Sequence, residues 1–124
     1  MTETATRNGP LADKTVTDLL VTTEAVIRDF GRWDYVYKKG PDGACRYRDG
    51  RGAPDCLIGH VLYRWGVLDL VEEGGAGLSL SFLGASTGVA DVAQVIQAAQ
   101  DEGETWSFAL GAGHHYADRL EADR

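Results

Sequence analysis

Apolar residues between Thr15 and Gly31 recur every three or four positions, which is the spacing of one face of an α-helix. Thr15 and Asp18 have the spacing of a capping box, and Gly31 is a typical helix stop. The pattern predicts a helix over residues 15–31, preceded by a flexible arm over residues 1–14. The predicted buried face comprises Val16, Leu19, Leu20, Thr23, Ile27 and Phe30.

Residues 34–39 show a different pattern, because they alternate around two tyrosines and a valine as a β-strand does. Residues 40–43, Gly-Pro-Asp-Gly, are a strong turn signal, and residues 44–48 then supply a returning strand. Together they predict a β-hairpin. A second turn over residues 49–52 leads to Asp55, which is a natural N-cap for the next helix.

Residues 56–65 are apolar on nearly all sides, which is typical of a helix buried at the centre of a core. A short helical turn over 67–73 and a glycine joint over 74–77 follow, and residues 78–83 alternate with serines in a way that suits a strand but is short. Two C-terminal helices are predicted, over 88–102 after Thr87 and from Thr105 onward. Residues 15–124 are therefore expected to form a single α+β domain that is mainly helical. The predicted core residues are Ile58, Val61, Leu62 and Trp65, packed by Phe30, Ile96, Trp106 and Leu110.

The composition is 44% hydrophobic and 25% charged, which is typical of a globular protein. The net charge of −7 is uneven: residues 1–66 carry +1, and residues 67–124 carry −8 because they contain ten acids and two arginines. Such a chain favours a protein partner with a basic surface and disfavours nucleic acid. The acids predicted to contact a partner are Glu72, Glu73, Asp91, Asp101, Glu102 and Glu104, with solubility alone as the equal alternative.

No apolar run approaches the roughly 20 residues that span a bilayer, and residues 1–13 lack the apolar stretch of a secretion signal. These features predict a cytoplasmic protein without membrane contact. The two cysteines, Cys45 and Cys56, are then expected to be reduced thiols or metal ligands.

Cys45, Cys56 and His60 form the candidate metal site, since Cys56 and His60 share a helix face and the hairpin brings Cys45 near them. Zinc would need a fourth ligand, from His114, His115 or Asp55. The competing interpretation, which the sequence favours, is two buried thiols and a core histidine without a cofactor. A third interpretation makes Cys56 the nucleophile of a thiol enzyme, because a helix N-terminus lowers the pKa of a thiol.

The predicted hairpin also gathers bases and aromatic residues, a combination that binds single-stranded nucleic acid by charge and stacking. We favour the simpler interpretation of a solvated hairpin face. The bases are Lys38, Lys39, Arg46, Arg48 and Arg51, interleaved with Tyr35, Tyr37 and Tyr47. His114 and His115 have the spacing of surface contacts with Asp118 and Arg119. The sequence contains no Walker loop, GxGxxG, HExxH or GxSxG motif.

With these residues placed, the chain resembles small accessory proteins encoded by phages of actinobacteria. The resemblance rests on Asp34 to Tyr37, Cys45 to Tyr47, Pro54 to Leu62, and Ala98 to Trp106 followed by Ala109 and Leu110. The resemblance implies a phage accessory protein that acts inside a bacterial host. It implies no activity and no site residue. The sequence therefore predicts a non-enzymatic protein that binds a host or phage protein. The alternatives are a metal-stabilised domain that contacts nucleic acid through its hairpin, and a thiol enzyme that uses Cys56.

Overall fold

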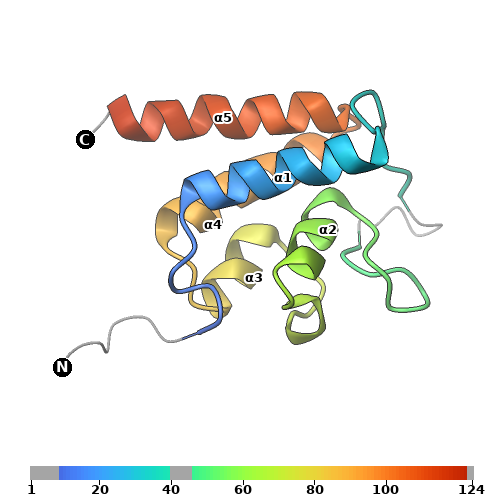
Figure 1. Ribbon diagram of the computed structural model, residues 1–124, viewed down its shortest axis with the longest axis horizontal. Coiled ribbons are helices and arrows are strands. Elements are labelled where there is room, and N and C mark those ends of the chain that lie inside the picture. The colour runs from blue at the N-terminus through green and yellow to red at the C-terminus, as the bar shows by residue number, and fades with distance from the viewer. Residues whose placement is uncertain (1–8, 40–45, 123–124) are drawn as a thin grey trace.

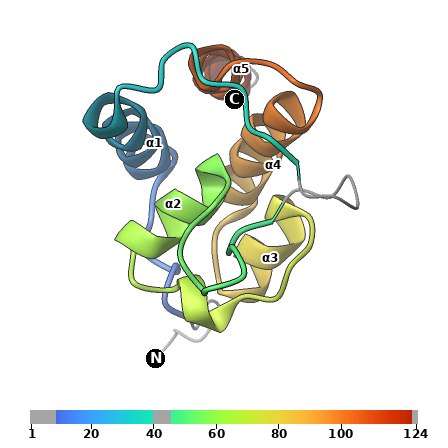
Figure 2. The ribbon, with the colours of Figure 1, turned by 90° about the vertical axis from the view of Figure 1, so that its right-hand side faces the viewer.

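The computed structural model describes residues 9–39 and 46–122, which form a bundle of helices. In Figures 1 and 2, three long helices lie along one another, and two short ones pack beneath them. The long helices are α1 (Val16–Phe30), α4 (Thr87–Asp101) and α5 (Trp106–Ala122). The short elements are α2 (Leu57–Arg64), the 3₁₀ turn η2 (Leu68–Leu70) and α3 (Ala76–Phe82). None of these described helices is long and apolar enough to cross a membrane.

The first helix confirms its sequence signals. The Thr15 hydroxyl accepts a hydrogen bond from the Asp18 amide at 3.0 Å, and the Asp18 carboxylate accepts one from the Thr15 amide at 2.9 Å. Gly31 ends the helix in the left-handed region at a φ of 63°, where a residue without Cβ is least strained. The predicted burial of Phe30 is wrong, because its side chain is 51% exposed at the end of the helix.

The predicted α+β fold is wrong, because the described residues contain isolated β-bridges and no strand. Val36 pairs with Thr105, far along the chain, and Arg48 pairs with Pro54. The proposed turn over 40–43 and the start of the return strand, including Cys45, lie outside the described residues. The described part of the chain is therefore all-helical.

Instead of forming a strand, the segment around the predicted first strand accepts hydrogen bonds from the first backbone amides of α5. The Trp106 amide donates to the Tyr35 carbonyl at 2.9 Å, and the Ser107 amide donates to the Trp33 carbonyl at 3.1 Å. The first amides of a helix have no partner within it, so a neighbouring segment that offers carbonyls is stabilised there. Trp33 lies in a turn and Val36 in an isolated bridge, so this segment pairs with the start of α5 rather than forming a strand.

The helix predicted as the centre of the core occupies that place. Ile58, Val61 and Leu62 are buried, as are Trp106 and Leu110, which confirms most of the predicted core. Trp65 is only partly buried, and its indole nitrogen donates to the Thr22 hydroxyl at 3.1 Å. The N-cap is Cys56 rather than Asp55: the Cys56 thiol accepts from the Gly59 amide at 3.4 Å, and Asp55 accepts the Tyr37 hydroxyl at 2.8 Å.

Glutamines of α4 complete the N-termini of both short helices. Gln100 accepts a hydrogen bond from the Leu57 amide at 2.8 Å, and Gln97 accepts one from the Ala76 amide at 2.6 Å. Gln94 accepts from the next amide of α3, that of Gly77, at 2.9 Å. The side chains of Gln97 and Gln100 are buried, so their amide oxygens replace water for these backbone groups.

Part of the predicted N-terminal arm belongs to the packed domain. The Leu11 side chain is fully buried, and its amide donates to the Leu83 carbonyl at 3.1 Å. Residues 9–14 therefore pack against the end of α3, while residues 1–8 of the predicted arm lie outside the described residues.

Candidate functional site

The segment between α2 and α3 packs one side against the core and exposes an apolar side chain on the other side. Leu68 and Val71 are buried, whereas Leu70 between them is 57% exposed. The 3₁₀ turn η2 causes this division, because it rotates successive side chains by about a third of a turn. Leu70 is thereby left at the surface beside Glu72 and Glu73.

The short helix α3 divides its apolar residues in the same way. Leu78, Leu80 and Phe82 would share one face of a strand, but in a helix Leu80 points to the core, and Leu78 and Phe82 lie four residues apart on the outside. Leu80 is fully buried, whereas Leu78 and Phe82 are 80% and 85% exposed. The sequence left residues 78–83 ambiguous, and their alternation belongs to a helix.

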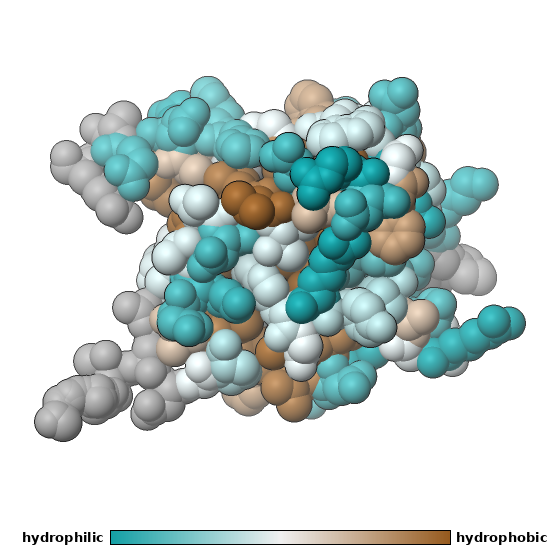
Figure 3. Space-filling model, viewed as in Figure 1, coloured by the Kyte–Doolittle hydropathy of each residue, from teal (hydrophilic) through white to brown (hydrophobic). Residues whose placement is uncertain are grey.

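These two elements enclose the α3 groove, which lies between residues 70–75 on one side and Leu78, Ser79 and Phe82 on the other. Its volume is about 350 Å³, near the lower end of the roughly 300–1,000 Å³ of ligand sites. In Figure 3, hydrophobic side chains reach the surface along the lower edge of the molecule, as well as in a patch in its upper half. Exposed apolar side chains beside a hollow are typical of an interaction site.

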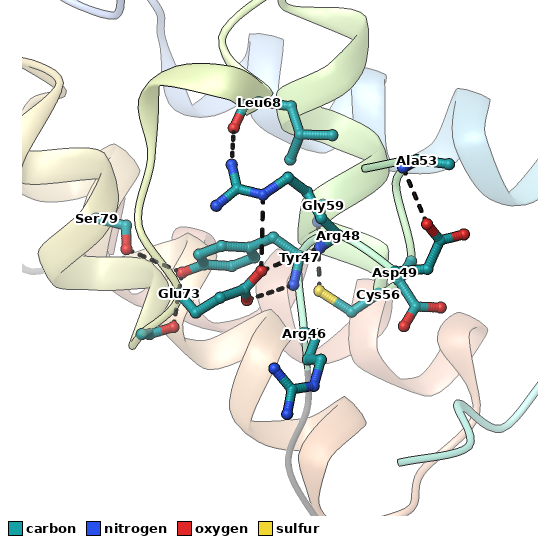
Figure 4. Close-up of polar contacts among 12 residues, drawn as sticks. Arg46, Tyr47, Arg48, Asp49, Ala53, Cys56, Gly59, Leu68, Glu73 and Ser79 are labelled. Atoms are coloured by element: carbon teal, nitrogen blue, oxygen red, sulfur yellow. Dashed lines mark hydrogen bonds and ion pairs between the residues drawn. The ribbon is translucent and has the colours of Figure 1, made fainter. Parts of the chain in front are cut away.

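Glu73 anchors one wall of the groove to the chain that precedes α2 (Figure 4). Its carboxylate accepts hydrogen bonds from the Tyr47 amide at 2.7 Å and the Arg48 amide at 3.2 Å. The Arg48 Nε atom lies 3.9 Å from the same carboxylate, and a guanidinium nitrogen of Arg48 donates to the Leu68 carbonyl. Glu73 is therefore a structural residue, in contrast to its predicted role as a free contact acid.

Tyr47 connects the two walls behind the groove. Its hydroxyl donates to the Gly74 carbonyl at 2.7 Å on one wall and lies 3.0 Å from the Ser79 hydroxyl on the other (Figure 4). Burial of the ring raises the pKa of Tyr47, so the hydroxyl keeps its proton and remains a donor. The buried Tyr47 therefore fixes the position of the two walls relative to each other.

The carboxylates at the rim of the groove differ in their partners. Glu72 is exposed and forms no hydrogen bond or ion pair with another described residue. The charge of Glu73 is balanced by Arg48, so Glu72 leaves the rim negatively charged.

The remaining predicted contact acids lie elsewhere. Asp101, Glu102 and Glu104 lie at the turn between α4 and α5, at the opposite side of the bundle from η2 in Figure 1. Glu102 and Glu104 are exposed, but the Asp101 carboxylate accepts a hydrogen bond from Gln100 at 3.0 Å. Asp91 is partly buried on α4. The structure thus separates the predicted acids into two surfaces.

The candidate zinc ligands are only partly placed. Cys56 is fully buried, His60 is 9% exposed, and Cys45 lies outside the described residues. The described residues contain no group of three histidine, cysteine or acidic side chains that could hold a metal. The Cys56 thiol serves as a helix cap, and the predicted further ligands His114 and His115 are exposed on α5.

His60 lies in an aromatic cluster. Its ring centroid is 5.0 Å from that of Phe30 and 5.8 Å from that of Trp106. Burial, reinforced by the charges of Arg32 and Arg64, lowers the pKa of His60 to about 4. At neutral pH the imidazole is therefore uncharged and packs as a core aromatic group.

The predicted hairpin segment has fewer accessible aromatic rings for binding nucleic acid than its sequence suggests. Lys38, Lys39 and Arg46 are exposed, but Tyr37 and Tyr47 are buried, with both hydroxyls hydrogen-bonded. Their rings are consequently unable to stack on bases from the surface.

Comparisons of the chain with protein-family models, curated proteins and solved structures find no match. Sequence reasoning identified Glu72 at the rim but missed Leu70, Leu78, Ser79 and Phe82. Leucine and phenylalanine four apart, next to a glycine run, were the available signal for an exposed helix edge.

Proposed function

We propose that this protein is a non-enzymatic binding module that engages a host or phage protein through the α3 groove. The observation that carries the proposal is the exposure of Leu78 and Phe82, at 80% and 85%, beside a hollow of about 350 Å³. Binding energy at protein interfaces is concentrated in a few apolar anchors that become desolvated. These two side chains and Leu70 are well suited to that role.

The charge near the groove supports a partner with a basic surface. Residues 67–124 carry −8, and Glu72 at the groove is exposed without a counter-ion among the described residues. Exposed acids steer a cationic partner and raise its association rate, while the apolar anchors set the dissociation rate. In this proposal the protein acts in the cytoplasm of a bacterial host, as its likeness to phage accessory proteins implies.

Affinity capture from an actinobacterial lysate tests the proposal when it compares groove variants with a matched control. The test protein carries Leu78→Ser and Phe82→Ser, and the control carries Phe108→Ser, an exposed aromatic residue on α5. We expect a protein that is retained by the wild type and by the control, released by salt, and absent from the groove variant. Capture that is identical for all three proteins would contradict a role for the groove.

The second acidic surface is tested in the same assay. Reversing Glu102 and Glu104 to Lys leaves the groove intact and keeps the contact between Asp101 and Gln100. Slower association of the captured protein would extend the contact to the turn between α4 and α5. An unchanged rate would leave those acids with a role in solubility alone.

A further inference from the structure

We infer that the occupant of the α3 groove is a cationic amphipathic helix of the partner, an inference that rests on the function proposed above. An extended peptide binds by pairing with the edge of a sheet, and the described residues offer isolated bridges in place of such an edge.

Two backbone carbonyls that line the groove are already used within the protein. The Gly74 carbonyl accepts from the Tyr47 hydroxyl and from the Gln97 side chain, and the Gly75 carbonyl accepts from the Ser79 amide. Just behind them, the Ala76 and Gly77 amides are held by glutamines of α4. This end of the groove favours a segment that satisfies its own amides and carbonyls, and an α-helix does so.

The side chains at the groove fit the apolar stripe of such a helix. Leu70 stands on one wall, and Leu78 and Phe82 stand one helical turn apart on the other. A polyproline segment needs a groove lined by several aromatic rings, whereas Phe82 is the one aromatic residue among the residues lining this groove. Leucine-like residues at i, i+3 or i+4, and i+7 of the partner match this arrangement.

The charges at the rim determine the polar face of the bound helix. Glu72 has no counter-ion among the described residues, and Arg48 is committed to Glu73 and to the Leu68 carbonyl. A lysine or arginine beside the apolar stripe would meet Glu72, whereas an acidic residue there would be repelled. The occupant is thus a helix with apolar residues on one face and basic residues at its border.

A peptide library displayed on yeast tests this inference with the full chain as the labelled target. Cells that bind the wild type are kept, and cells that also bind the Leu78→Ser, Phe82→Ser variant are discarded. We expect the retained peptides to show helical apolar spacing with flanking Lys or Arg, and to gain helical circular dichroism when bound. The groove variant should weaken a retained peptide about tenfold or more. Glu72→Lys should weaken it about two- to fivefold, and Glu24→Lys on α1 should not.

Three outcomes would overturn the inference. Retained peptides with alternating or proline-rich patterns would show that the occupant is not a helix. The absence of any peptide that distinguishes wild type from groove variant would show that no short segment fits. Concentration-dependent self-association that Leu78→Ser and Phe82→Ser abolish would show that a second copy covers the groove. If lysate capture still depends on the groove in the first two cases, the proposed function stands and only the helical occupant is rejected.

Discussion

The Oε1 atom of Gln100 lies 2.8 Å from the backbone nitrogen of Leu57, the first residue of α2. The same oxygen accepts a hydrogen bond from the indole nitrogen of Trp106, at the start of α5, at 3.2 Å. The Gln100 side chain is 1% exposed. One buried amide oxygen of α4 therefore serves the beginnings of two other helices.

Replacing Gln100 with Leu should lower the free energy of unfolding by about 2–4 kcal/mol, because two buried donors lose their acceptor. A urea titration followed by circular dichroism measures the loss. Gln94→Leu is the matched control, since Gln94 is exposed and accepts from one exposed amide, so it should cost less than about 1 kcal/mol. Equal losses would show that burial of the acceptor does not matter here.

Two glycines of α5 should respond in opposite ways to alanine. A Cβ at Gly111 meets nothing within 4 Å, so Gly111→Ala should stabilise the helix by up to about 1 kcal/mol. A Cβ at Gly113 would lie 2.7 Å and 2.9 Å from atoms of Ile96, so Gly113→Ala should destabilise the protein by about 1–3 kcal/mol. Melting temperatures of the two variants test the pair. A rise for both would mean that Ile96 moves aside without cost.

The long helices were predictable because their signals are local. Thr15 and Asp18 form the expected capping box, and Thr105 caps α5 by accepting from the Phe108 amide at 3.1 Å. The apolar positions of these helices also repeat over several turns, which distinguishes them from strands. The predicted bounds of α1 and α4 each differ from the observed ones by one residue.

The hairpin and α3 could not be predicted from local pattern alone. The carbonyls of Trp33 and Tyr35 have their partners at the start of α5, roughly 70 residues away in sequence, and no turn signal encodes that pairing. The alternation of Leu78, Leu80 and Phe82 is a strand pattern. It is overridden because α4 supplies glutamines that cap a short helix at Ala76.

The sequence therefore indicated the acidic residues of the candidate groove but not its apolar residues. Glu72 and Glu73 stood out by charge, but charge alone did not reveal that Glu73 holds backbone amides and that Glu72 has no partner among the described residues. The apolar anchors were hidden because residues 74–77 were interpreted as a joint and the structure of residues 78–83 was left ambiguous. An exposed apolar face is recognisable only after the buried face has been identified.

The two neighbouring glutamates should differ in their effect on stability. Glu73→Ala removes the acceptor of the Tyr47 and Arg48 amides and should cost about 1–2 kcal/mol. Glu72→Ala removes an exposed, unpaired carboxylate and should change stability by less than about 0.5 kcal/mol. Denaturant titration of both variants gives the comparison. A larger loss of stability in Glu72→Ala than in Glu73→Ala would contradict the structural role assigned to Glu73.

Stability should decrease as the pH falls from 6.5 toward 4 because of His60. The unfolded histidine takes up a proton near its ordinary pKa of 6.5, whereas burial keeps the folded one neutral until about pH 4. Protonation in this window therefore favours the unfolded state, on the order of 1 kcal/mol between pH 6.5 and 5.

The pH measurement has a clear control. Asp18 and Asp29 have folded pKa values below 3.8, so their contributions are lost at more acidic pH than the His60 window. Unfolding titrations at pH 7 and pH 5 should show the decrease in the wild type and a smaller one in His60→Phe. An unchanged decrease in that variant would assign the effect to other groups.

The placement of the helix caps on α4 sets the order in which the chain can fold. Helices of eight and seven residues are too short to persist alone, since isolated helices below about 12–15 residues are marginal in water. The acceptors for Leu57 and Ala76 lie 43 and 21 residues further along the chain. During synthesis, α2 and α3 must therefore wait for α4 to leave the ribosome, and the first half of the protein acquires its native form only when the second half arrives.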